Sequence, residues 1–112
     1  MLTGVRLPDV EEKQSIILNK NPLKIGLMTY LLGKDWDVET IIRNCTAAGF
    51  QSVELRTTHA HGVEVALTPS QRAEVKKRFK DSPLETISLA SAFQYHFPDR
   101  AELKRNVVGT KE

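Results

Sequence analysis

Residue types that commonly mark a function are scarce in this 112-residue chain. Cys45 is the single cysteine, which excludes an internal disulfide and an all-cysteine metal site. No apolar run approaches the roughly 20 residues of a membrane-spanning helix. The 16 basic and 14 acidic residues leave a formal charge of only +2. So small a surplus does not favour a nucleic-acid partner, and the sequence predicts no membrane span.

Several catalytic and targeting motifs are also missing. No Gly-x-Gly-x-x-Gly follows a strand pattern, which argues against a dinucleotide fold. Gly33-Lys34 lacks the frame of a phosphate-binding loop, and Ser88 and Ser91 lack a nucleophile-elbow context. The N-terminus lacks the charged-then-apolar order of a signal peptide. We therefore expect a cytoplasmic protein, with an exported mature form as the open alternative.

The composition is that of one ordinary globular domain. Hydrophobic residues make up 40% of the chain and charged residues 27%. Residues 1–23 form a lead-in, in which a short helix is expected to run from Pro8 to Leu18 before Asn19–Pro22 breaks it. Residues 24–112 form the expected domain.

From Lys24 onward, strand and helix patterns alternate. Apolar runs of strand length begin near residues 24, 52 and 84. Asp37 is a natural N-cap for a helix over 38–48 that ends at Gly49. Thr68, Pro69 and Gln71 predict a capping box at the start of a helix over 69–81. Asp99 caps a third helix, whose apolar residues are Leu103, Val107 and Val108.

This order, βαβαβα, predicts an α/β fold with a parallel sheet. Eight units of the same spacing would need about 240 residues, close to the roughly 250 of a (β/α)8 TIM barrel. The chain thus holds about three units, and we expect a partial, apparently truncated TIM-barrel domain over residues 24–112.

Polar side chains gather where the predicted strands end, which is where sites lie in parallel α/β folds. Tyr30 ends the first strand, Arg56, His59 and His61 follow the second, and His96 follows the third. Glu54 and Arg56 share one strand face, which would point toward the barrel axis. They could bind substrate, or they could form an ion pair that fills the barrel.

Other patterns leave two interpretations open. His59-Ala-His61 on an extended segment could share a divalent metal, although two histidines in a loop are more often polar contacts. Trp36 and Phe93 could wall a sugar-sized pocket or pack over a helix start. The basic run from Arg72 to Lys80 is expected to be a solvated outer helix face, with an anion-binding patch as the alternative.

Three stretches together resemble the opening of xylose-isomerase-like barrel proteins, often described as sugar phosphate isomerases/epimerases. They are Lys24-Ile-Gly-Leu-Met-Thr-Tyr30, Ala48-Gly-Phe-Gln-Ser-Val-Glu-Leu-Arg56 and Thr58-His-Ala-His-Gly62, and the resemblance runs from Leu23 to the C-terminus. It implies a (β/α)8 barrel with a divalent metal (Mn, Mg, Co or Zn) and proton transfer next to a carbonyl. In that family most metal ligands and both catalytic carboxylates come from later strands.

The resemblance therefore implies the substrate-binding arc of a sugar isomerase/epimerase-like barrel, with catalytic residues unknown. We expect a sugar or sugar phosphate as ligand, and either self-association or a missing C-terminal part. One alternative is a metal-dependent hydrolase or abasic-site endonuclease with His59 and His96 as ligands. Another is a non-catalytic fragment that associates through open sheet edges. The expected substrate-binding residues are Arg56, His59, His61, Glu54, Tyr30 and His96.

Overall fold

The computed structural model describes residues 4–7, 9, 11 and 23–112. The helix expected between Pro8 and Leu18 falls mainly on other residues and lies outside the described part. Within the described part, no helix combines the length and apolarity needed to cross a membrane.

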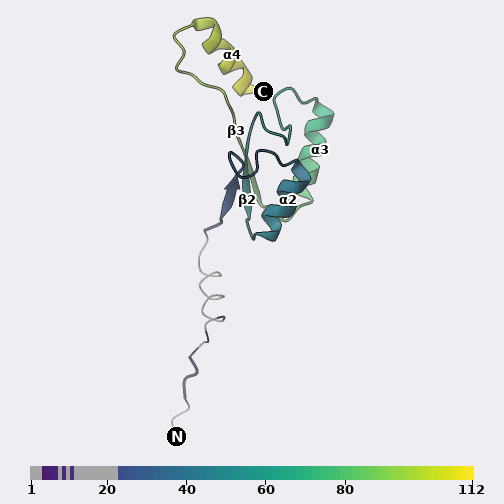
Figure 1. The fold of residues 1–112 in the computed structure, drawn as a ribbon, viewed down its shortest axis with the longest axis vertical. Coiled ribbons are helices and arrows are strands. Elements are labelled where there is room, and N and C mark those ends of the chain that lie inside the picture. Colours follow the sequence, from purple (N-terminus) through teal and green to yellow (C-terminus); the bar gives the residue numbers. More distant parts are fainter. Residues whose placement is uncertain (1–3, 8, 10, 12–22) are drawn as a thin grey trace.

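Helices and strands alternate along the chain as the sequence predicts (Figure 1). The sheet is parallel, and its strands lie in the order β1-β2-β3. The α/β class and the βαβαβα order are therefore confirmed. The elements are β1 (Gly26–Met28), α2 (Val38–Ala47), β2 (Ser52–Arg56), α3 (Pro69–Lys80), β3 (Thr86–Ala90) and α4 (Arg100–Lys111).

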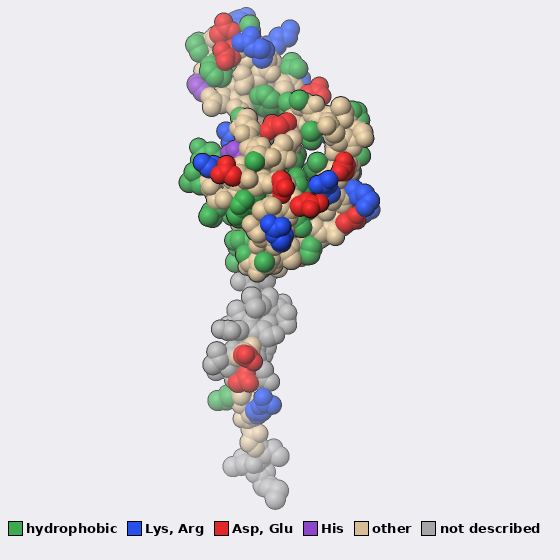
Figure 2. Space-filling view, turned by 45° about the vertical axis from the view of Figure 1, so that its right-hand side comes forward, with side chains coloured by type: hydrophobic (Ala, Val, Ile, Leu, Met, Phe, Trp, Pro, Cys, Tyr) green, Lys and Arg blue, Asp and Glu red, His purple; other side chains and the backbone are tan. Residues whose placement is uncertain are grey.

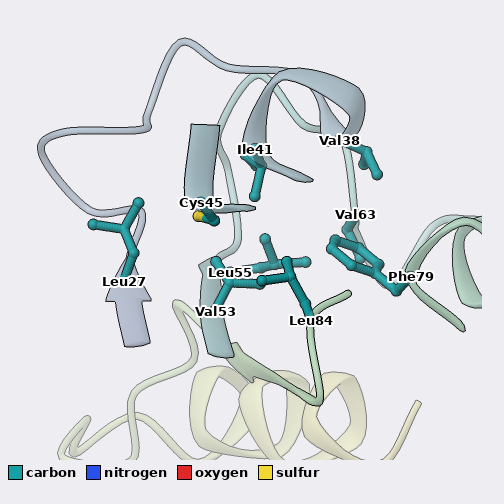
Figure 3. Close-up of a cluster of buried hydrophobic side chains, with 9 residues drawn as sticks. All are labelled: Leu27, Val38, Ile41, Cys45, Val53, Leu55, Val63, Phe79 and Leu84. Carbon is teal, nitrogen blue, oxygen red and sulfur yellow. The ribbon is translucent and has the colours of Figure 1, made fainter. Parts of the chain in front are cut away.

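The order of the strands places α2 and α3 on one face of the sheet. When successive parallel strands are neighbours and every crossover has the same hand, each helix returns over the same face. Val53 and Leu55 of β2 point to this face and are 2% and 1% exposed. They share one core cluster with Ile41 and Cys45 of α2 and Phe79 of α3 (Figure 3). The alternation along β2 therefore buries Val53 and Leu55 against the helices and leaves Glu54 and Arg56 on the other face.

Cys45 behaves as a small hydrophobic residue of this core. Its side chain is buried, and desolvation by that burial raises the pKa of the thiol. A thiol held in its neutral form packs like an aliphatic group and is a poor nucleophile. We therefore assign Cys45 a packing role.

The predicted caps explain where α2 and α3 begin. An Asp37 carboxylate oxygen accepts a hydrogen bond from Thr40 N at 2.8 Å, and this bond lowers the pKa of the Asp37 carboxyl. Thr68 and Gln71 form a complete capping box, in which Gln71 N donates to Thr68 Oγ1 and Gln71 Oε1 accepts from Thr68 N. After α2 the chain turns through Gly49, whose φ of 77° is a conformation that glycine adopts without strain.

Replacing the cap of α3 should lower stability measurably. We expect Thr68→Ala to reduce the free energy of unfolding by about 1 kcal/mol, because the amide of Gln71 loses its acceptor. Urea unfolding followed by circular dichroism measures this change. Ser70→Ala, in the same exposed helical turn, is the control and should stay within about 0.5 kcal/mol of the parent chain. Equal effects of the two substitutions would show that the cap contributes nothing.

The apolar face expected on α4 is not buried, unlike the inner faces of α2 and α3. Val107 and Val108 are 37% and 52% exposed, and no residue of α4 is buried. The loop before α4 packs against this helix instead. Phe93 lies so close to Gly109 that a Cβ there would approach the ring to 2.3 Å. Gln94 N also donates to Asn106 Oδ1 at 2.9 Å.

Candidate functional site

The carboxyl ends of the parallel strands form one edge of the sheet, which we call the rim: residues 29–36, 57–67 and 91–98. Two threonine hydroxyls hold this edge together. Arg56 N donates to Thr29 Oγ1 at 3.0 Å, and Ala92 N donates to Thr57 Oγ1 at 3.0 Å. Ala60 N donates to Lys34 O at 2.9 Å and joins the first two rim segments directly. The rim is therefore bonded to the sheet and across its own segments.

Thr29 and Thr57 are positioning residues that our sequence analysis did not identify. Each continues the alternation of buried residues one step beyond its strand, after Leu27 and Leu55 respectively. They are 0% and 7% exposed, so their hydroxyls are buried and must find partners. The sequence does carry a signal for these two residues. Each places a polar side chain where the alternation along a strand calls for an apolar one.

Arg56 lies against Tyr30 at the rim. Its guanidinium carbon lies 6.0 Å from the centre of the Tyr30 ring, within the range of a cation–π contact. One nitrogen, Nη1, donates to Thr57 O at 3.1 Å and to Thr57 Oγ1 at 3.3 Å. Among the residues that the structure describes, no carboxylate pairs with Arg56. The ion pair considered between Glu54 and Arg56 is therefore not formed.

His59 joins this group through the other side of Tyr30. The two ring centres lie 6.3 Å apart with the planes inclined by 33°. The Nδ1 atom of His59 is buried and has no hydrogen-bond partner in the described part of the chain. A buried polar atom without a partner costs about 1–3 kcal/mol, and such atoms call for an explanation, one of which is an unseen ligand or water. Tyr30, Arg56 and His59 are thus the predicted site residues that the fold brings together.

His61 is built into the loop. Its Nε2 donates to Arg56 O at 2.7 Å, and its Nδ1 accepts from Val63 N at 3.0 Å. This pair of bonds requires the neutral ring with its proton on Nε2. The ring is 7% exposed, and both nitrogens are bonded to the backbone. In this arrangement His61 orders the rim and presents no nitrogen to a ligand.

The interpretation of His59-Ala-His61 as an extended ligand pair is wrong. Residues 57–61 form turns, and Thr58 adopts a φ of 71°, so the alternation of an extended segment is lost. The two rings meet edge to face with their centres 6.1 Å apart. Glu64 accepts a hydrogen bond from Thr58 N and stabilises this turn. The pair cannot present two free nitrogens to one metal in this conformation.

His96 and the aromatic residues of the rim make other contacts. The ring of His96 stacks on Phe97 with centres 4.6 Å apart, and within the described residues no ring contact joins it to His59 or His61. Trp36 packs against the core cluster, and Phe93 packs on Gly109. The packing interpretation of these two aromatic residues is favoured over a sugar-binding wall.

Glu54 lies on the face of the sheet that α2 and α3 do not cover. Its Oε2 accepts a hydrogen bond from Ser88 Oγ at 3.1 Å, across the register pair that joins β2 to β3. Met28 lies on the same face and is 47% exposed. Glu54 and Arg56 thus share one half-buried, polar face, as the alternation predicts.

The divalent metal implied by the resemblance does not fit the donors found here. No group of three or more His, Cys, Asp or Glu side chains in the described ranges is arranged to hold a metal ion. We therefore derive no chemical step through a metal on this chain.

Charged side chains of both signs are mixed on the face of the molecule drawn in Figure 2. Figure 2 shows Lys and Arg side chains interspersed with Asp and Glu on the face that it presents. On α3, Lys77 pairs with Asp81 at 2.6 Å and Arg78 with Glu74 at 2.6 Å. The solvated outer face expected for these residues is confirmed for Lys77 and Arg78.

Comparisons of the chain with protein-family models, curated proteins and solved structures give no significant match.

Proposed function

We propose that this chain is the N-terminal, substrate-binding part of a sugar or sugar phosphate isomerase/epimerase-like barrel. The observation that carries the proposal is the half-buried Arg56 guanidinium at the carboxyl end of β2, which no carboxylate neutralises among the described residues. A guanidinium in such a position suits a phosphate or a hydroxyl-rich ligand.

The arrangement of the sheet supports the same proposal. Sequential parallel strands with their helices on one face are what a (β/α)8 barrel requires. The opposite face, which carries Glu54, Arg56 and Ser88, would then line the barrel interior. Tyr30, Arg56 and His59 would contact the ligand, while Thr29, Thr57 and His61 would position the loops. The proton-transfer chemistry would belong to residues outside this chain.

A binding experiment on the chain tests the proposal. We expect ribose 5-phosphate to shift the NMR signals of Tyr30, Arg56 and His59, and Arg56→Gln to weaken this binding about tenfold or more, because a charge-assisted hydrogen bond is lost. Arg43→Gln is the matched control, since Arg43 is exposed on α2 and its side chain donates to Thr40 Oγ1 at 3.3 Å. Thermal unfolding of both variants separates lost binding from lost structure.

Two results would contradict this assignment. The first is an equal loss of affinity in the Arg56 and Arg43 variants. The second is a set of ligand-induced shifts that avoids the rim. No isomerisation is expected from this chain by itself, so binding, and not turnover, is the decisive measurement.

A second candidate is a non-catalytic module that associates through the edge of β1 that no other strand of the described residues covers. Large apolar side chains border this edge, and Leu23, Ile25 and Leu31 are 77%, 66% and 76% exposed. An unpaired strand edge with apolar side chains is a ready template for another strand. Sedimentation velocity over a range of concentrations distinguishes this candidate, because it predicts a concentration-dependent dimer. The hydrolase or nuclease alternative, which needs His59 and His96 around one metal, receives no such support, since His96 stacks on Phe97 and no ring contact within the described residues joins it to His59.

A further inference from the structure

Glu54 and Arg56 are two half-buried charges of opposite sign on the face of the sheet that α2 and α3 leave uncovered. They stand two residues apart on β2, so the rise of a strand separates their Cα atoms by about 6.6 Å. Among the described residues, no salt bridge includes either side chain. Removing a charge from water without a partner is costly, so this face is suited to a ligand that supplies the missing partners.

The Glu54 carboxylate has capacity for a further hydrogen-bond donor. Its Oε2 accepts from Ser88 Oγ at 3.1 Å, and within the described part of the chain its Oε1 has no hydrogen-bond partner. Its neighbours across the sheet, Met28 and Ser88, are both neutral. A carboxylate can accept about four hydrogen bonds. Glu54 therefore suits a cationic donor such as an ammonium group.

The Arg56 guanidinium is held at the rim, and so it does not neutralise Glu54. Its Nη1 donates to Thr57 O at 3.1 Å, and its Cζ lies 6.0 Å from the centre of the Tyr30 ring. Both contacts are with residues at the carboxyl ends of the strands, whereas Glu54 is bonded to Ser88 further back along the sheet. The cation and the carboxylate thus remain at two separate points of one face.

The residues beside these charges favour a polar ligand. Ser88 and Ala90, the register partners of Glu54 and Arg56 on β3, both have small side chains. Ser88 is exposed, and its hydroxyl is directed to the carboxylate. A hydroxyl-rich molecule that carries both charges would therefore find polar partners along this face.

We propose that this face binds an amino sugar phosphate, with its ammonium group at Glu54 and its phosphate at Arg56; this substrate class rests on the sugar phosphate function proposed above. A neutral sugar phosphate would pair with Arg56 alone and leave the carboxylate without a cation. An amine without a phosphate would leave the guanidinium without an anion. A ligand with both charges is complementary to both residues, which is what gives specificity at a charged site.

Calorimetric titration with three sugar phosphates tests the proposal. They are glucosamine 6-phosphate, glucose 6-phosphate and N-acetylglucosamine 6-phosphate. In a buffer acidic enough to protonate the amine, we expect glucosamine 6-phosphate to bind about tenfold more tightly than the other two, because it alone brings a cation to Glu54. The side-chain carboxyl NMR signal of Glu54 should shift with glucosamine 6-phosphate more than with glucose 6-phosphate.

Glu54→Gln should remove the preference for the amine. The amide oxygen still accepts a hydrogen bond from Ser88 Oγ, so the substitution removes the charge and keeps the contact. Glu39→Gln is the matched control and should retain the preference, because Glu39 is exposed on α2 and pairs with Arg78 at 3.6 Å. Thermal unfolding of both variants shows whether they fold. If Glu54→Gln does not fold, the comparison of the three ligands on the parent chain decides.

The outcomes separate this proposal from the proposed function. Equal affinities of the parent chain for glucosamine 6-phosphate and glucose 6-phosphate would overturn the amino sugar assignment and leave the sugar phosphate function standing. Failure of all three ligands to bind would contradict both. A preference that persists in Glu54→Gln would place the ammonium group elsewhere. A Glu54 carboxyl signal that shifts with protein concentration in the absence of ligand would show that a second copy of the chain covers this face.

Discussion

Leu55→Ala is expected to remove most of the cooperative stability of this fold, whereas Leu89→Ala is expected to leave it nearly unchanged. The two residues are register partners on the same face of neighbouring strands. Leu55 is 1% exposed and Leu89 is 59% exposed. Truncating a buried leucine costs about 2–5 kcal/mol, because apolar contacts are lost and a cavity remains.

The size of the domain makes this effect large. Small domains are stabilised by only about 5–15 kcal/mol in total, so Leu55→Ala removes a major share. Urea unfolding monitored by circular dichroism should show a strongly lowered midpoint for Leu55→Ala, and a change within about 0.5 kcal/mol for Leu89→Ala. Similar losses for both variants would mean that β3 is covered on this face in solution, contrary to the exposure of Leu89.

His61→Ala is expected to destabilise the chain by about 2–4 kcal/mol, because it leaves one buried and one part-buried backbone group without partners. These groups are the carbonyl of Arg56 and the amide of Val63. The loop between β2 and α3 should lose its fixed conformation, and the rim should lose affinity for ribose 5-phosphate at the same time. Thermal unfolding and the phosphate titration measure the two effects.

His61→Asn provides the matched comparison for this position. The Asn side-chain oxygen can take the place of Nδ1 as the acceptor for Val63 N, although it cannot also reach Arg56 O as the longer ring does. We therefore expect His61→Asn to lose about half as much stability as His61→Ala. If His61→Ala were as stable as the parent chain, the structural role given to this ring would be wrong.

The local signals in the sequence were sufficient to predict most of the fold. Thr68, Pro69 and Gln71 specify where α3 begins, and the alternation through Val53 and Leu55 specifies which face of β2 is buried. These features depend on neighbours a few residues apart, which a sequence displays directly. The parallel order of the strands followed from the alternation of strand and helix patterns.

The position of α4 could not be predicted in the same way. It depends on contacts between residues far apart in the sequence. Phe93 packs on Gly109, and Arg72 donates a hydrogen bond to Glu112 O. The apolar pattern of Leu103, Val107 and Val108 indicates a helix but does not specify its partner surface. Whether the chain forms part of a closed barrel also remains a prediction, since it depends on strands beyond the three described.

The candidate site was predicted in outline, and the details depended on tertiary contacts. Tyr30, Arg56 and His59 were expected at one end of the sheet and are found together there. The structural role of His61 depends on a turn with a positive φ at Thr58, which a threonine adopts only rarely. No sequence pattern indicated that turn.

The hydrogen bonds to the Thr29 and Thr57 hydroxyls lower the entropy that a ligand would cost the rim on binding. Because these hydroxyls and the Ala60–Lys34 bond already fix the loop backbone, a ligand would find it ordered in advance. Ordering a side chain on binding costs about 0.5–1.5 kcal/mol, and ordering a whole loop costs more. At this rim the cost falls mainly on the ring of Tyr30, which is 53% exposed. Association should therefore proceed without a slow loop rearrangement, at a rate set by diffusion and orientation.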